Sequence, residues 1–321
     1  MTLVRRRTLG SVAPLLAIAV AMGLASSTTK PANAKDPDAA AQAERCASRL
    51  SLALLGKSAD ATLLAASDPQ AQIDAMLATP EFKERFARYI NASFNRAPGN
   101  TPADDAPYWL AKKILDGGKP WRDLFVGPYD VVEDSNGNAS VTDSADGLGY
   151  FRSLAWQRRY AGNEPSGLKI STAYRMAQNT VALKLVAVTN QPGADISAIG
   201  RAKAPCNSCH IDEWYALDKL ASVLTRRNDS GNAVTFDPPK GGPQTVLGGI
   251  TVSNDKELVT ALVDSDAFRV RQCRLAWSYL YGRDENTCEA PVFDKCMASF
   301  TAAGTIQSAI RTIAIDPSFC Q

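Results

Sequence analysis

Apolar residues recur three and four positions apart through long stretches of the chain, the spacing that lines one face of an α-helix. The pattern is clearest between residues 36 and 95, where it includes Ile73, Met76, Leu77, Phe82, Phe86, Tyr89 and Ile90. Thr79-Pro80 interrupts it, because proline starts helices well but is poorly tolerated inside them. We therefore expect amphipathic helices in this region, with a break at Thr79-Pro80.

The same periodicity predicts helices over 108–116, 120–125, 171–188, 214–224, 255–281 with a break near Asp264, and 291–315. Two segments rich in glycine, asparagine, aspartate and proline are typical of irregular structure. We expect 128–168 to form a long loop, and 232–253 to form turns with at most a small hairpin. The predicted fold class is mainly α, with long irregular loops.

The first 34 residues have the three parts of a secretory signal peptide: arginines at 5–7, an apolar run over 9–25, and Ala32-Asn33-Ala34 as a cleavage site. Pro14 interrupts a run that is shorter than the about 20 residues of a spanning helix, so we expect no transmembrane anchor after cleavage. Cleavage removes four basic residues and no acidic ones, which changes the formal net charge from +2 to −2. Nothing then indicates a nucleic-acid partner, which calls for a basic surface.

One motif indicates a specific chemistry. Cys206-Asn207-Ser208-Cys209-His210 is a C-x-x-C-H sequence, typical of covalent haem c attachment. Both thiols lie on one side of a helical turn, and His210 then becomes the proximal ligand of the haem iron. The alternatives are a Cys206–Cys209 disulfide of a thiol redox motif, a zinc site and a chance match. His210 is the only histidine, which excludes haem held by two histidines of this chain.

The second axial position of the iron decides the function. The mature chain has three methionines, Met76, Met176 and Met297, and we take Met176 as the tentative distal ligand. An open or water-ligated iron, or a lysine or tyrosine ligand, are the alternatives. A closed position favours one-electron transfer, whereas an open one permits peroxidase or oxygenase chemistry.

Five cysteines remain outside the motif, and an exported chain can oxidise them. They are Cys46, Cys273, Cys288, Cys296 and Cys320, and an odd number leaves at least one without a partner in the chain. We expect the pairs Cys288–Cys296 and Cys273–Cys320, which leaves Cys46 over.

The order of features resembles secreted bacterial proteins built from cytochrome-c-like domains of unknown function. In that family the C-x-x-C-H motif is followed by Ile-Asp, an apolar-acidic helix and a terminal helical module. The matching segments here are Ile211-Asp212, 215–220, 266–268, 279–283, Ala309-Ile310 and 316–319, with 78–82 and 122–125 upstream. The resemblance implies a haem-binding secreted protein and no particular reaction. The expected organisation is a signal peptide over 1–34, an N-terminal helical region with a long loop over 35–168, and a haem-c module with a cysteine-rich helical module over 169–321.

The expected function is that of a monohaem c-type cytochrome in the periplasm, at the cell surface or outside the cell. It would carry single electrons to a redox partner protein or a larger electron-transfer assembly. Trp214 and Tyr215 are expected to pack in the core beside the motif, with a role in electron entry as the alternative. The other candidate functions are a haem-dependent peroxidase or oxygenase, and a structural partner protein whose haem nucleates folding.

Overall fold

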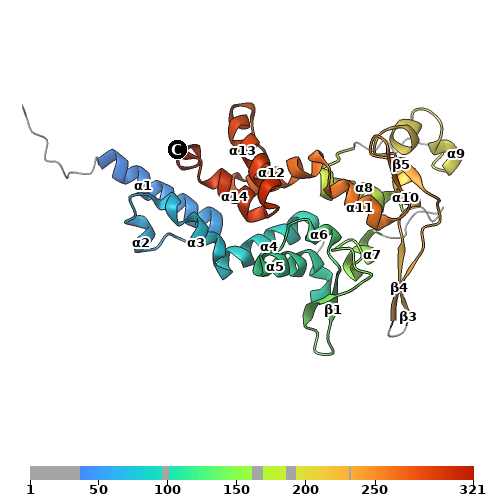
Figure 1. The fold of residues 1–321 in the computed structure, drawn as a ribbon, viewed down its shortest axis with the longest axis horizontal. Helices are drawn as coiled ribbons and strands as arrows, with labels where there is room; N and C mark the ends of the chain where they lie inside the picture. Colours follow the sequence, from blue (N-terminus) through green and yellow to red (C-terminus); the bar gives the residue numbers. More distant parts are fainter. Residues whose placement is uncertain (1–36, 96–100, 161–168, 186–192, 231–232) are drawn as a thin grey trace, which may run out of the picture.

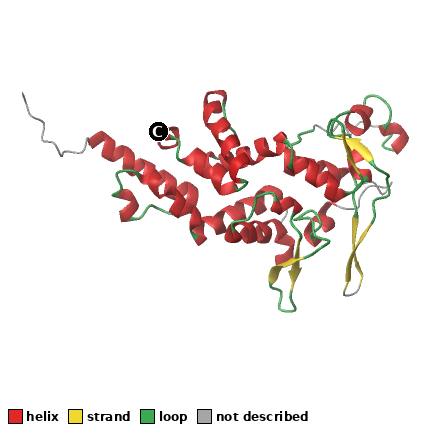
Figure 2. Ribbon diagram, in the orientation of Figure 1, coloured by secondary structure: helices red, strands yellow, loops and turns green. Residues whose placement is uncertain are grey.

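The computed structural model describes residues 37–95, 101–160, 169–185, 193–230 and 233–321, and the predicted signal peptide lies outside them. Helices dominate the described chain, with short antiparallel hairpins as its β-structure (Figures 1 and 2). The predicted mainly α class is confirmed. No helix within the described ranges is long and apolar enough to cross a membrane.

The N-terminal helices are α1 (Pro37–Leu50), η1 (Ser51–Leu55), α2 (Ala61–Leu64), η2 (Pro69–Gln72), α3 (Ile73–Ala78) and α4 (Pro80–Phe94). The predicted break at Thr79-Pro80 is confirmed. Thr79 is extended, and its side-chain Oγ1 accepts a hydrogen bond from the Phe82 backbone N at 3.2 Å. This cap satisfies a backbone donor at the start of α4, and Pro80 occupies the first helical position, where its missing N–H costs nothing.

The next elements are η3 (Pro102–Asp105), α5 (Ala106–Gly117), α6 (Asp123–Val126), β1 (Tyr129–Glu133), β2 (Ala139–Asp143) and α7 (Leu154–Tyr160). The prediction of one long loop over 128–168 is wrong for its described part, which holds a hairpin and a helix. Tyr129 and Val131 alternate on the buried side of β1, so this strand has a core-facing side. Asn136-Gly137, taken as a loop signal, lies in the turn between the two strands, with Gly137 at φ 79°.

The following segment contains α8 (Ile170–Val181), α9 (Ala198–Arg201), η4 (Ser208–Asp212) and α10 (Leu217–Ser222). α8 ends at Ala182, which is left-handed, so the prediction of a helix to 188 is wrong; residues 186–188 lie outside the described ranges. α10 is also shorter than predicted. Two further hairpins follow, formed by β3 (Arg226–Ser230) with β4 (Ala233–Asp237) and β5 (Gln244–Val246) with β6 (Ile250–Val252). The described chain therefore holds three small hairpins, where the sequence predicts at most one.

The C-terminal helices are α11 (Asp255–Val263), α12 (Asp266–Tyr281), η5 (Thr287–Glu289), α13 (Ala290–Ala303), α14 (Ile306–Ala314) and η6 (Pro317–Cys320). The predicted break near Asp264 is confirmed, with Ser265 as the cap of α12. The stretch 291–315, predicted as one, is divided because Gly304 adopts φ 68° and Thr305 caps α14.

A main apolar core runs through the molecule from α1 to η6. Trp121, Trp156 and Trp277 are its largest fully buried side chains. Residues from both sides of position 168 contribute to it, so the two predicted regions share one core. A smaller cluster of Ala177, Leu183 and Leu217 lies between α8 and α10.

Two disulfides cross-link the structure, and the pairing differs from the predicted one. Cys46 pairs with Cys320, and Cys273 pairs with Cys296. Cys288 is exposed and free, so it is the cysteine left over outside the motif. The spacing of the cysteines does not determine their pairing; α13 packs along α12, and this places Cys296 against Cys273. In the same way η6 lies against α1, which brings the two ends of the described chain together.

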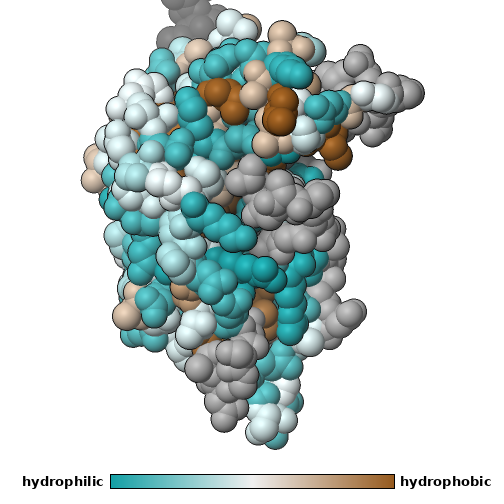
Figure 3. Space-filling model, turned by 90° about the vertical axis from the view of Figure 1, so that its right-hand side faces the viewer, coloured by the Kyte–Doolittle hydropathy of each residue, from teal (hydrophilic) through white to brown (hydrophobic). Residues whose placement is uncertain are grey.

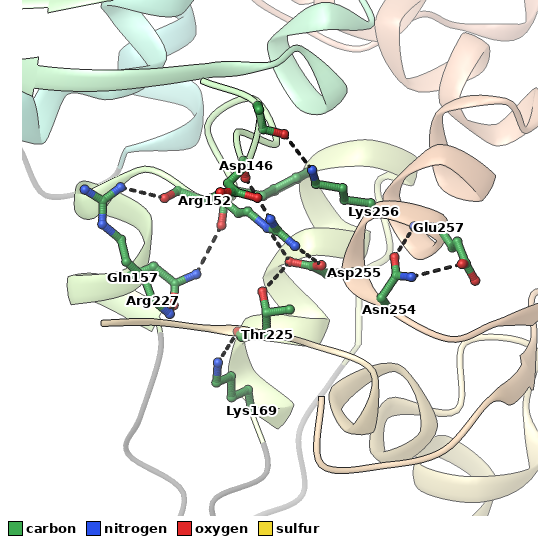
Figure 4. Close-up of polar contacts among 12 residues, drawn as sticks. Asp146, Arg152, Gln157, Lys169, Thr225, Arg227, Asn254, Asp255, Lys256 and Glu257 are labelled. Carbon is green, nitrogen blue, oxygen red and sulfur yellow. Dashed lines mark hydrogen bonds and ion pairs between the residues drawn. The ribbon is translucent and has the colours of Figure 1, made fainter. Parts of the chain in front are cut away.

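A buried polar network joins the segment before α7 to α11 and to the segment that follows α10 (Figure 4). Arg152 donates from Nε and Nη2 to the two carboxylate oxygens of Asp255, at 2.9 and 2.6 Å. Thr225 Oγ1 donates to Asp255 Oδ2 at 2.6 Å, and Lys169 donates to the Thr225 carbonyl oxygen. Arg227 donates to the Arg152 carbonyl oxygen. The network thereby ties the segments before α8 and after α10 to α11.

Candidate functional site

The motif lies at one end of the long axis of the molecule, beside α9, α10 and β5 (right-hand side of Figure 1). The His210 backbone N donates to the Cys206 carbonyl oxygen at 3.1 Å, and the Glu213 N donates to Ser208 O at 2.9 Å. These bonds form the short helical turn of η4, as predicted from the spacing. Cys206 and Cys209 are both free and partly exposed, so both sulfur atoms are available for thioether bonds.

The His210 ring is fixed through one nitrogen. Its Nδ1 lies 2.6 Å from Asp218 Oδ2, and both side chains are largely buried. A carboxylate accepts only, so Nδ1 carries the proton, and Nε2 keeps the lone pair that a metal ion needs. A carboxylate behind the ring also fixes the orientation of a ligating histidine and raises its basicity.

Asp218 is held in turn by Arg201. The Arg201 Nε donates to Asp218 Oδ1 at 2.9 Å, and its Nη1 donates to the Ile196 carbonyl oxygen at 2.6 Å. Arg201 lies at the end of α9 and Asp218 in the first turn of α10. The pair therefore fastens α9 to α10 and fixes the carboxylate that orients His210.

The two aromatic residues after the motif differ in their surroundings. Tyr215 is partly buried against both apolar clusters, and its hydroxyl donates to Cys209 Sγ at 3.3 Å. This hydrogen bond, together with burial, raises the pKa of Tyr215 to about 12. Trp214 is 43% exposed, so the prediction of core packing is wrong for this residue. Its backbone oxygen accepts from Leu247 N at 2.7 Å, which ties the β5–β6 turn to the motif.

Several large apolar side chains around the motif are exposed. Among the described residues eight such side chains are exposed, and four of them belong to this region: Ile196, Ile199, Trp214 and Ile250. Figure 3 shows apolar surface gathered toward the upper end of this face of the molecule. Soluble proteins seldom leave grouped apolar side chains in water without a function.

The alternatives to haem are a Cys206–Cys209 disulfide of a thiol redox motif and a zinc site. The two thiols are not joined to each other. No group of three or more histidine, cysteine, aspartate or glutamate side chains in the described part of the chain is arranged to hold a metal ion. The donor set instead fits covalent haem: two free thiols within one turn and one imidazole with its Nε2 available.

The two methionines considered as distal ligands lie on helices outside the motif, and their surroundings differ. Met176 lies on α8, the helix that packs against α10, but it is 2% exposed and belongs to the main core together with Ala173. The neighbouring face of α8, with Tyr174 and Ala177, is the one that joins the small cluster beside the motif. Met297 lies on α13, near the middle of the long axis and away from α9 and α10 (Figure 1). The distal ligation by Met176 stays a prediction.

Sequence reasoning missed the roles of Asp218 and Arg201. Asp218 was visible only as the acidic residue of an apolar-acidic helix, eight positions after His210. Arg201 carried no signal, because its contact depends on how α9 packs against α10.

Comparison of the chain with protein-family models, with curated proteins and with solved structures finds no match. The resemblance to cytochrome-c-like proteins therefore rests on the residues of the motif and its surroundings.

Proposed function

We propose that this protein is an exported monohaem c-type cytochrome that carries single electrons. Cys206 and Cys209 hold the haem through thioether bonds, and His210 Nε2 is the proximal ligand. The observation that carries the proposal is the helical turn from Cys206 to His210, in which two free thiols accompany an imidazole whose Nδ1 lies against Asp218. The two disulfides agree with an oxidising compartment. The partner is a redox protein or a larger electron-transfer assembly.

The bound haem supplies one-electron exchange between ferric and ferrous iron. The residues of the chain fix its geometry. Asp218 keeps the Nδ1 proton and the ring orientation of His210, and Arg201 keeps Asp218 in place. Trp214, which follows the motif and is 43% exposed, offers an aromatic edge to solvent. We place the entry of the electron at this edge.

The test is covalent haem attachment. The full-length chain would be produced in cells that attach haem c, and the purified protein would be analysed after denaturation by mass spectrometry and by its haem absorption. We expect one haem per chain. The double variant Cys206→Ala/Cys209→Ala should contain none, because both thioether bonds are removed.

Cys288→Ala is the matched control, because Cys288 is a free thiol outside the motif. It should bind one haem like the unmodified chain. His210→Ala should retain the covalent bonds but lose the absorption of an imidazole-ligated iron. Mature protein without covalent haem would overturn the proposal.

A second candidate is a haem-dependent peroxidase or oxygenase with an open distal position. The carboxylate on His210 favours it, because a more basic proximal ligand gives more electron density to the iron. The position of Met176 in the main core favours it as well. A high-spin ferric spectrum would support this candidate, whereas a low-spin spectrum with a thioether-to-iron band would support electron transfer and methionine ligation.

A further inference from the structure

A second site of interest is a cavity of about 120 Å³ that is distinct from the motif. It is bordered by α4, α7, α8 and α12. Arg175 comes from α8, Arg271 from α12, and Lys184 from the segment after α8. Gln178 and Asn179 add amide groups, and Phe94 contributes an apolar wall. The described residues that line the cavity include three cations and no carboxylate.

The charge of Arg271 is poorly compensated. Its Nε is buried and has no hydrogen-bond partner among the described residues. Burial and the like charge of Arg274 lower the pKa of Arg271, whereas electrostatic interaction with Tyr89 and Asp284 acts in the opposite direction. A buried donor without an acceptor is costly, and partial burial disfavours the charged form of the guanidinium. An anion in the cavity would offset both costs.

The other two cations are also available to a ligand. Arg175 donates to the Gln178 side-chain oxygen, which is a neutral partner. Lys184 is exposed at the edge of the cavity. Guanidinium groups bind carboxylates and phosphates through two parallel hydrogen bonds, so two arginines from different helices can hold one oxyanion from two sides.

We propose that this cavity binds one small oxyanion, a phosphate or a short carboxylate, through Arg175, Arg271 and Lys184. The volume supports a small ligand, because a protein cavity of about 150 Å³ is large enough to hold a benzene molecule. The proposal does not depend on haem attachment at Cys206 and Cys209.

Isothermal titration calorimetry on the full chain tests the site. Sodium phosphate and sodium succinate would be titrated separately, in sodium chloride solutions of matched ionic strength. We expect one saturable site for at least one of the two, and the comparison distinguishes phosphate from carboxylate. Arg175→Gln and Arg271→Gln should each weaken binding at least tenfold, because each removes a charged two-point contact.

Arg269→Gln is the matched control. Arg269 lies on α12 like Arg271, but it pairs with Asp266 at the surface and does not line the cavity. The affinity of the Arg269→Gln variant for the anion should equal that of the unmodified chain. If circular dichroism shows that Arg271→Gln is unfolded, the affinities of Arg175→Gln and Lys184→Gln for the anion test the proposal in its place. Absence of saturable binding of both anions, or an affinity unchanged in Arg175→Gln, would overturn the proposal.

Discussion

Two side chains in series, Arg201 and Asp218, position His210, and the direction of their hydrogen bonds determines which nitrogen of the imidazole carries the proton. Arg201 donates to Asp218, and Asp218 accepts the Nδ1 proton of His210. The positive charge of Arg201 draws electron density from the carboxylate, while the short contact to Nδ1 increases the density on the ring. If His210 ligates the haem iron as proposed, this carboxylate makes it a stronger electron donor to the iron than an imidazole bound to a neutral acceptor would be.

This arrangement predicts a change in the reduction potential of the haem-loaded protein. Asp218→Asn replaces the carboxylate by a neutral amide of similar shape. The ferric form, which has the higher charge, should lose more stabilisation than the ferrous form, so the potential should rise. For a one-electron couple, each tenfold change in the equilibrium between the ferric and ferrous forms shifts the potential by about 59 mV. A spectroelectrochemical titration measures the shift.

Asp212→Asn is the control for this prediction. Asp212 lies two residues after His210, but its carboxylate accepts a hydrogen bond from Asn207 and does not contact the imidazole. Like Asp218→Asn, the variant Asp212→Asn removes one negative charge close to His210. Equal shifts in the two variants would mean that the local charge sets the potential and the bond to His210 does not. Loss of haem from the unmodified chain would instead refute the proposed function.

Among the elements, α11 and the segment before α7 are joined by the most deeply buried ion pair described here. The Arg152 and Asp255 side chains are only 7% and 6% exposed. Asp255 is also the first residue of α11, where a negative charge interacts favourably with the helix dipole. Asp255→Asn leaves Arg152 buried without its counter-charge and should lower the free energy of unfolding by about 3–5 kcal/mol, which urea unfolding measures.

Asp264→Asn is the matched comparison, because Asp264 pairs with Arg122 while both side chains are about half exposed. Surface pairs contribute about 0–1 kcal/mol, so this variant should be nearly neutral. The double variant Arg152→Met/Asp255→Leu should recover part of the loss, because it removes both charges. Similar effects of Asp255→Asn and Asp264→Asn would contradict the structural role of the buried pair.

The sequence predicts elements well where the signal is local. The breaks at Thr79-Pro80 and near Asp264 follow from capping residues and a proline, and the structure confirms both. The hairpin of β1 and β2 was missed, because turn residues such as Asn136-Gly137 favour a loop and a hairpin alike. The turn of η4 was likewise predictable from its spacing. The contacts of Asp218 and Arg201 depend on the packing of α9 against α10, which no local pattern encodes.

At the scale of the whole molecule, the candidate site lies at one end and the Cys46–Cys320 disulfide at the other, whereas Cys273–Cys296 joins α12 to α13 between them (Figure 1). The C-terminus lies beside α1, whereas α9 and α10 lie at the other end of the long axis (Figure 1). The main core connects the two ends. The cross-links therefore stabilise the fold without contributing a residue to the motif.

The two disulfides should differ in their contribution to stability. Cys46–Cys320 spans 274 positions of sequence, and Cys273–Cys296 spans 23. A cross-link restricts the unfolded chain more when it closes a longer loop, which corresponds to about 5 and about 3 kcal/mol in the chain-entropy account. Replacing Cys46 and Cys320 by alanine should lower the free energy of unfolding more than replacing Cys273 and Cys296, as measured by urea unfolding without reductant. Cys288→Ala should leave it unchanged, since Cys288 is exposed and free. The opposite order would show that local packing around the disulfides outweighs the restriction of the unfolded chain.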